Sequence, residues 1–137
     1  MINKEMLTAK YPTAVYVAFG DSPELADELA ELIASGVKTG SCGSLADCIE
    51  DNAYPIIGAY RIVENGSGIP VCVIRTTRLQ LLRFSEVTDE LARKEGEGDL
   101  SLDYWKKEHQ RFFEGEGNFT EDMELVFEEF SLIEKIQ

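Results

Sequence analysis

The feature that most limits the possible folds is a pair of strand-like segments joined by a strong turn. Residues 58–63 and 71–84 are rich in apolar and β-branched side chains, and the turn-forming run ENGSG lies between them at 64–68. This arrangement predicts a β-hairpin. The second segment is long, so we expect a bend or bulge near Thr76 and Thr77. The chain therefore contains an antiparallel sheet around which everything else must pack.

Helical patterns lie on both sides of this hairpin. Asp21 or Ser22 can cap a helix with Pro23 in its first turn, and Gly36 can end it. Between them runs one apolar stripe at helical spacing, formed by Leu25, Leu29, Leu32 and Ile33. We expect shorter helices at 44–48, capped by Ser44, and at 88–94, and a longer one that follows a Ser101 cap.

The two ends of the chain have weaker patterns. Residues 1–13 show little periodicity, and we expect them to lie loosely on the surface. Residues 15–19 are apolar without clean alternation, whereas residues 123–133 read as a final strand. The order of elements predicts an α+β fold, with a small, mostly antiparallel sheet or barrel flanked by helices.

Length and composition fit a single domain. The chain has 137 residues, of which 44% are apolar, and we expect one domain over residues 1–137 with its core at about 22–133. No run approaches the roughly 20 apolar residues of a membrane span, and no secretory leader pattern is present, so we expect a cytoplasmic protein with no membrane contact. Three cysteines without metal-ligand spacing predict reduced thiols and no metal site: Cys42, Cys48 and Cys72.

The charge is strongly negative and unevenly distributed. A formal net charge of −13 argues against binding to long duplex DNA, which depends on many contacts from Lys and Arg to phosphates. Residues 86–129 carry 15 acidic and 5 basic side chains, whereas residues 38–83 carry 4 acidic and 5 basic ones. A pocket for a nucleoside, a nucleotide or a short single strand remains compatible with these numbers, and the middle segment is where we expect a phosphate to bind.

Lys38 and Ser41 form the first candidate catalytic pair. A lysine just after a helix end, beside glycines, would lose its proton if it were partly buried, and it would then accept a proton from a nearby hydroxyl. The plainer interpretation is that Lys38 contacts the last carbonyls of the helix while Ser41 begins a turn. Spacing alone favours this plainer interpretation.

Glu95 and Glu97, on either side of Gly96, form the second candidate. A carboxylate in a cleft can act as a general acid or base when its pKa is raised. Most acidic runs are solvated surface, which is the alternative here. Glu95 is the better catalytic candidate, because it ends a predicted helix and Gly96 permits a sharp turn after it.

Two further groups are candidates for ligand contact rather than catalysis. Trp105 could stack on a base, although its helical spacing also suits the core, and His109 on the same stripe is expected to be a structural histidine rather than a catalyst or metal ligand. Arg75, Arg78 and Arg83 form the second group. Arg75 or Arg78 would hold a ribose or phosphate, and the alternative for all three is pairing with the many carboxylates.

Several of these segments, taken in order, resemble the ASCH domain family. They are GVKT at 36–39, the hairpin that ends in IPV at 69–71, the Thr76-Thr77 pair, EGEGD at 95–99, and the helix with Trp105 and His109. The resemblance runs from about residue 25 to residue 132 and is strongest to the stand-alone bacterial members. It implies a β-barrel similar to the PUA domain, with a cleft between barrel and helices that is lined by the Gly-x-Lys element, including Thr39.

The family resemblance also implies a set of functions. Members are thought to bind RNA or nucleotides, and some small members hydrolyse the amide of N4-acetylated cytidine with a lysine, a hydroxyl residue and a glutamate. These residues fall on Lys38, Ser41 and Glu95 here, and the hydroxyl residue is often threonine in the family. The implied protein binds a nucleoside, nucleotide or RNA and acts as an amidohydrolase on N4-acylated cytidine, with Glu97 at the ligand and no cofactor.

Three alternatives remain open at this point. The chain would be a non-catalytic module for short single-stranded RNA, a ribonuclease that uses the same cleft, or a protein-interaction domain whose face is the acidic segment 86–129. The sequence leaves the oligomeric state undetermined.

Overall fold

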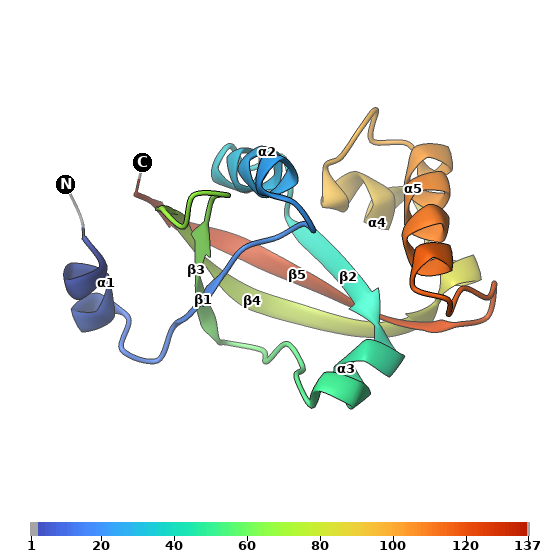
Figure 1. Ribbon diagram of the computed structural model, residues 1–137, viewed down its shortest axis with the longest axis horizontal. Helices are drawn as coiled ribbons and strands as arrows, with labels where there is room; N and C mark the ends of the chain where they lie inside the picture. Colours follow the sequence, from blue (N-terminus) through green and yellow to red (C-terminus); the bar gives the residue numbers. More distant parts are fainter. Residues whose placement is uncertain (1–2, 137) are drawn as a thin grey trace.

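A curled, open sheet forms the centre of the molecule. The computed structural model describes residues 3–136, in which five strands pair in the order β1-β3-β4-β5-β2. Their bounds are β1 Val15–Val17, β2 Gly40–Ser44, β3 Tyr60–Glu64, β4 Pro70–Arg83 and β5 Glu124–Lys135. β1 runs parallel to β3 and the other pairs are antiparallel. The expected α+β class with a mostly antiparallel sheet is confirmed, and the sheet is a half-barrel (Figure 1).

The predicted hairpin is the pair β3 and β4. Register along the long pair of β4 and β5 shifts between Thr76 and Arg78, which is where we expected a bulge. Because the bulge inserts one residue, Thr76 is buried while Thr77 and Arg78 are both exposed.

The helices begin at the caps that the sequence predicts. Their bounds are α1 Lys4–Lys10, α2 Pro23–Ala34, α3 Leu45–Asp51, α4 Asp89–Glu95 and α5 Leu102–Gly115, with one 3-10 turn at Phe84–Glu86. The side chains of Ser22, Ser44 and Ser101 accept backbone N–H bonds at the starts of α2, α3 and α5. The longest of these helices has 14 residues, so no helix within residues 3–136 is long enough to cross a bilayer.

Helices cover both faces of the sheet. α2 lies over one face, where Ile33 packs with Val63 and Ile74. α4 and α5 sit together at one end of the sheet (Figure 1), over a core that contains Trp105 and Phe127. Residues of α2, β2 and α5 together line the site described below.

Two segments differ from the sequence-based expectations. Residues 4–10 form α1, and Leu7 is fully buried against Ile62 and Val73 on the face of the sheet opposite α2. The expectation of a loose surface segment is therefore wrong for this part, because a single well-placed leucine anchors it; residues 1 and 2 lie outside the described residues. The strand β2 was not predicted, because its sequence GSCGS has no apolar alternation.

Candidate functional site

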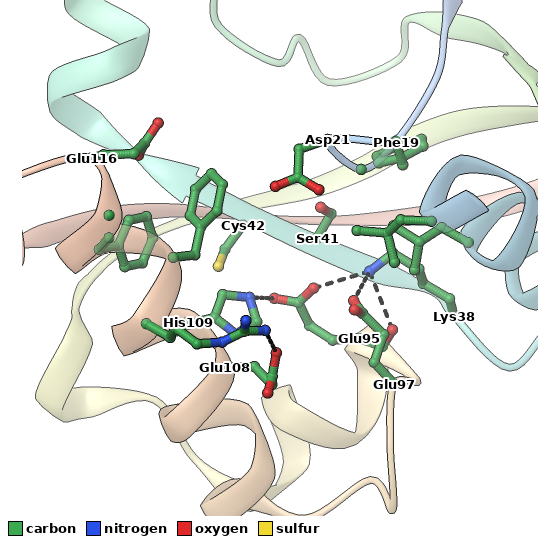
Figure 2. A pocket seen from close by; sticks show the side chains of 17 residues that line it. Phe19, Asp21, Lys38, Ser41, Cys42, Glu95, Glu97, Glu108, His109 and Glu116 are labelled. Atoms are coloured by element: carbon green, nitrogen blue, oxygen red, sulfur yellow. Dashed lines mark hydrogen bonds and ion pairs between the residues drawn. The ribbon is translucent and has the colours of Figure 1, made fainter. Parts of the chain in front are cut away.

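A cavity of about 690 Å³ opens between α2, β2 and α5. Apolar side chains from both helices line it, among them Leu29 of α2 and Phe112 of α5, and its floor carries charged side chains. The predicted residues Lys38, Ser41, Glu95 and Glu97 all line this cavity. Figure 2 shows Lys38, Glu95 and Glu97 converging from the segment after α2, the end of α4 and the α4–α5 connection, whereas the Ser41 side chain on β2 is turned toward Asp21.

Lys38 is almost completely buried on the cavity floor, with 1% of its side chain exposed. Its Nζ donates to Glu95 Oε1 at 3.0 Å, to the Glu95 carbonyl oxygen at 3.2 Å and to Glu97 Oε2 at 2.9 Å (Figure 2). An ammonium has three N–H donors, so each of them finds an acceptor. Burial without these partners would be costly, and the two glutamates make it tolerable.

A glycine lets the two glutamates approach Lys38. α4 ends at Glu95, and Gly96 follows in the left-handed region with φ 71°. A Cβ at residue 96 would lie 2.7 Å from the Val37 carbonyl oxygen and 2.8 Å from Lys38 Cα. Gly96 is therefore needed both for the sharp turn and for the close contact between the two backbone segments. The backbone N–H of Thr39 also donates to the Lys94 carbonyl at 2.7 Å and ties the same segments together.

The second oxygen of Glu95 is also held. Oε2 accepts from Trp105 Nε1 at 2.9 Å and lies 3.3 Å from His109 Nε2. Burial by itself raises the pKa of Glu95, but the Lys38 charge and the contacts from His109 and Trp105 outweigh it. The net effect lowers the pKa of Glu95, so the carboxylate is ionised.

Lys38 has the matching protonation state. Burial by itself lowers the pKa of Lys38, but the charges of Glu95 and Glu97 and their hydrogen bonds raise it further, so its net pKa is raised. The lysine is therefore a charged ammonium. This corrects the expectation of a neutral Lys38 beside a protonated Glu95, because the two groups form a buried ion pair.

Two further residues face Glu95 in the cavity: His109, which the sequence analysis expected to be structural, and Cys42, which it expected only to be a reduced thiol. His109 stacks on Trp105 with ring centroids 4.1 Å apart, and its Nδ1 is 2.9 Å from the Trp105 carbonyl oxygen. Burial by itself lowers the pKa of His109, but the hydrogen bond and charge of Glu95 raise it by more, so its net pKa is raised. Cys42 lies on β2. Its burial, and to a lesser extent the charge of Glu95, raise the pKa of its thiol. The register of β2 with β5, which no pattern in GSCGS reveals, is what brings Cys42 here.

Ser41 lies beside Cys42 on β2 and is partly buried in the same cavity. Within residues 3–136 its hydroxyl makes no hydrogen bond to Lys38. Ser41 is thus placed at the cavity without being held by the lysine.

The structure does not bring the other predicted ligand contacts into the cavity lining. Arg75 is exposed, donates from Nε to the Gly58 carbonyl at 3.0 Å and covers the Tyr60 ring. Arg78 is exposed and lies 3.7 Å from Glu129. Thr39 is exposed, and Trp105 is buried behind Glu95, where it orients the carboxylate.

The cavity is rich in carboxylates. Within the described chain its lining contains five acidic side chains, whereas the fixed cations are Lys38 and Arg111. The acidic residues are Asp21, Glu95, Glu97, Glu108 and Glu116. Lys38 is already paired as described, and Arg111 pairs with Glu108. The site is therefore better suited to hydrogen-bond donors than to anions.

The fold and this cavity define a class of protein: a PUA-like half-barrel with a ligand-sized cleft between the sheet and the helices. The family model of the ASCH domain matches residues 15–134. The chain therefore belongs to the ASCH domain family.

Solved structures agree with this assignment. The chain is similar to the ASCH domain from Lactobacillus crispatus JV V101, with a TM-score of 0.82, 31% identity, and coverage of 96% of this chain and 86% of that one. It is also similar to a protein from Enterococcus faecalis V583, with a TM-score of 0.82, 32% identity, and coverage of 96% and 85%. A comparison with curated proteins found no significant match.

Proposed function

We propose that the cavity binds a nucleoside, either free or as an unpaired residue of a short RNA. The observation that carries this proposal is the combination of apolar side chains from α2 and α5 with buried charged groups in one cavity of about 690 Å³. Pockets of roughly 300–1,000 Å³ with few, well-placed polar groups are typical of small-molecule sites. Membership of a family thought to bind RNA or nucleotides supports the same class of ligand.

The charge of the cavity narrows the choice of ligand. Glu97 keeps 29% of its side chain exposed at the cavity, so its carboxylate remains within reach of a ligand beside the buried ion pair. Carboxylates accept hydrogen bonds, which favours a base with an exocyclic amino group and a ribose with free hydroxyls. A 5′-phosphate would meet mainly acidic side chains. We therefore expect cytidine to bind better than uridine and better than its 5′-monophosphate.

Calorimetric titration with these three compounds tests the binding proposal. Glu97→Gln removes the charge of this carboxylate, and we expect it to weaken cytidine binding by about tenfold or more, because hydrogen bonds to charged groups contribute roughly 1.5–3 kcal/mol. Glu90→Gln is the control, since Glu90 is exposed and lies outside the cavity. Equal loss in both variants, or no heat of binding with wild type, would contradict the proposal.

One observation favours catalysis as a second candidate function. Ser41, Lys38 and Glu95 line the same cavity although they come from separate elements. In the reaction we propose, the Ser41 hydroxyl attacks the acyl carbonyl carbon of N4-acylcytidine, and the bond from that carbon to N4 breaks. The serine proton passes through Glu95 to N4, and water then hydrolyses the acyl-serine to release the acid.

The buried ion pair has a defined part in this reaction. All three N–H donors of Lys38 are bound to Glu95 and Glu97 in the free protein, so in this step the ammonium exchanges one of these hydrogen bonds for the negative oxygen of the tetrahedral intermediate and stabilises it. Once the ammonium also interacts with that oxygen, it stabilises the Glu95 carboxylate less. The pKa of Glu95 therefore rises, and the carboxylate becomes a better proton acceptor. Charged Lys38 thus acts on the oxygen rather than on the serine proton.

The hydrolase proposal is tested by measuring, by chromatography, the release of cytidine from N4-acetylcytidine. We expect Ser41→Ala to lose at least about a hundredfold in rate, as loss of a nucleophile removes the covalent route. Ser131→Ala, on exposed β5 surface outside the cavity, is the control. If wild type releases no cytidine, catalysis is excluded and binding stands alone; cleavage of unmodified RNA would instead indicate a ribonuclease.

A further inference from the structure

Three side chains in the cavity bring a thiol, an imidazole and a carboxylate together. One potential ligand atom from each of Cys42, Glu95 and His109 lies within 4.8 Å of the other two. The residues come from β2, from the end of α4 and from α5, so the fold creates a cluster that no sequence spacing shows. Figure 2 shows the Cys42 sulfur turned toward the His109 ring, which in turn faces Glu95.

We propose that Cys42, Glu95 and His109 bind a zinc ion. Thiolate, imidazole and carboxylate are the ligand types that Zn²⁺ takes, and three protein ligands beside an open cavity leave a fourth position for water. Hard cations such as Mg²⁺ and Ca²⁺ prefer sites made of oxygen alone. The thiol therefore selects zinc, or a similar first-row metal ion, over them.

The distances suit this ion. Zinc lies about 2.0–2.2 Å from nitrogen and oxygen ligands, so two such ligands in a tetrahedral site are about 3.3 Å apart. His109 Nε2 and Glu95 Oε2 are 3.3 Å apart. The Cys42 sulfur lies within 4.8 Å of one potential ligand atom of each partner, so a shift of at most roughly 1 Å reaches the spacing of a zinc–thiolate site.

The surroundings of the ligands also fit a metal site. His109 Nδ1 is 2.9 Å from the Trp105 carbonyl, and a carbonyl oxygen only accepts, so Nδ1 carries the hydrogen and Nε2 faces Glu95. Metal-binding histidines are oriented in this way by a backbone carbonyl or carboxylate on the other ring nitrogen. Trp105 Nε1 and Lys38 Nζ fix the Glu95 carboxylate in turn.

Cobalt titration of the metal-free full chain tests the site directly. Co²⁺ bound to a thiolate gives a charge-transfer absorption in the near ultraviolet, and tetrahedral coordination adds bands in the visible. We expect both with one equivalent of Co²⁺, and their loss when one equivalent of Zn²⁺ is added. Absence of the thiolate band in wild type overturns the proposal, whatever happens in any variant.

Matched cysteine variants locate the metal. Cys42→Ser should lose the charge-transfer band and the rise in melting temperature that Zn²⁺ causes, whereas Cys48→Ser should keep both, because Cys48 lies on α3 outside the cluster. Melting of each variant without metal shows whether it folds. A band that survives in Cys42→Ser contradicts the assignment. No nucleoside enters these experiments, so the zinc site and the proposed function can fail separately.

Discussion

Lys38 is the residue on which the site depends, because a buried ammonium must be both neutralised and hydrogen-bonded. Glu95 and Glu97 do both. Removing one partner of a buried ion pair leaves the other charge without compensation, which is far more costly than losing a pair at the surface. The cavity floor is therefore a unit in which each charge requires the other.

We predict that Lys38→Met destabilises the protein by about 3–5 kcal/mol, since it leaves Glu95 buried without its counter-charge. Urea unfolding measures this difference. Lys4→Met is the control, because the pair of Lys4 with Glu64 is at the surface, with 59% of the lysine side chain exposed, and such pairs contribute at most about 1 kcal/mol.

A double variant sharpens the same prediction. When Glu95→Gln accompanies Lys38→Met, no full charge remains at that carboxylate, and the combined loss should be smaller than the sum of the two single losses. Strict additivity would mean that the two side chains do not stabilise each other, contrary to the geometry described above.

At this scale the sequence identified the charged residues but not their arrangement. Spacing alone favoured a structural role for Lys38, and its link with Glu95 came from the family resemblance. Their protonation could not be predicted, because it depends on a distance of 3.0 Å between residues 57 positions apart. Cys42 and His109 were missed as neighbours for the same reason.

Among the elements, α1 shows how little sequence signal a well-packed segment needs. It has seven residues and a single fully buried side chain, Leu7, which contacts the face of the sheet opposite α2. Lys10 and Tyr11 at its end both donate to Glu134 on β5. The strong helix α2 was predictable from its cap and stripe, whereas α1 and β2 depend on tertiary contacts.

We predict that Leu7→Ala lowers the free energy of unfolding by about 2–5 kcal/mol, which is the usual range for removing a large apolar side chain from a core. Met6→Ala, one position earlier and 52% exposed, is the control. Chemical denaturation of both variants decides the matter: an equally small effect for the two would mean that α1 lies loosely on the surface after all.

The contact of Tyr11 with Glu134 makes stability depend on alkaline pH. Burial and the neighbouring carboxylate raise the pKa of Tyr11 to about 12. A group whose pKa is raised on folding stabilises the protein below its unfolded pKa, about 10 for tyrosine, and this contribution is lost as pH rises toward the folded value. Wild type should therefore lose more stability than Tyr11→Phe between pH 10 and pH 12, as followed by thermal unfolding. Parallel curves for the two proteins would show that the contact is not made in solution.

The whole molecule combines a predictable fold class with a cavity that no local pattern reveals. The hairpin, the caps and the apolar stripes were sufficient for an α+β fold with a mostly antiparallel sheet. The cavity arises from the separation of α2 and α5 above β2, which is a property of the assembled fold. Arg75 and Arg78 looked suitable for a ligand in the sequence, yet the structure places them outside the cavity lining.

The central claim is that this cavity, and not the arginine-bearing part of β4, is the nucleoside site. Titration of isotope-labelled protein with cytidine, followed by backbone amide NMR, tests it most directly. We predict saturable shifts that are largest at Ser41, Cys42 and Glu97, with Arg75 and Arg78 unchanged. Shifts centred on Arg75 and Arg78, or no shifts at high cytidine concentration, would contradict the account.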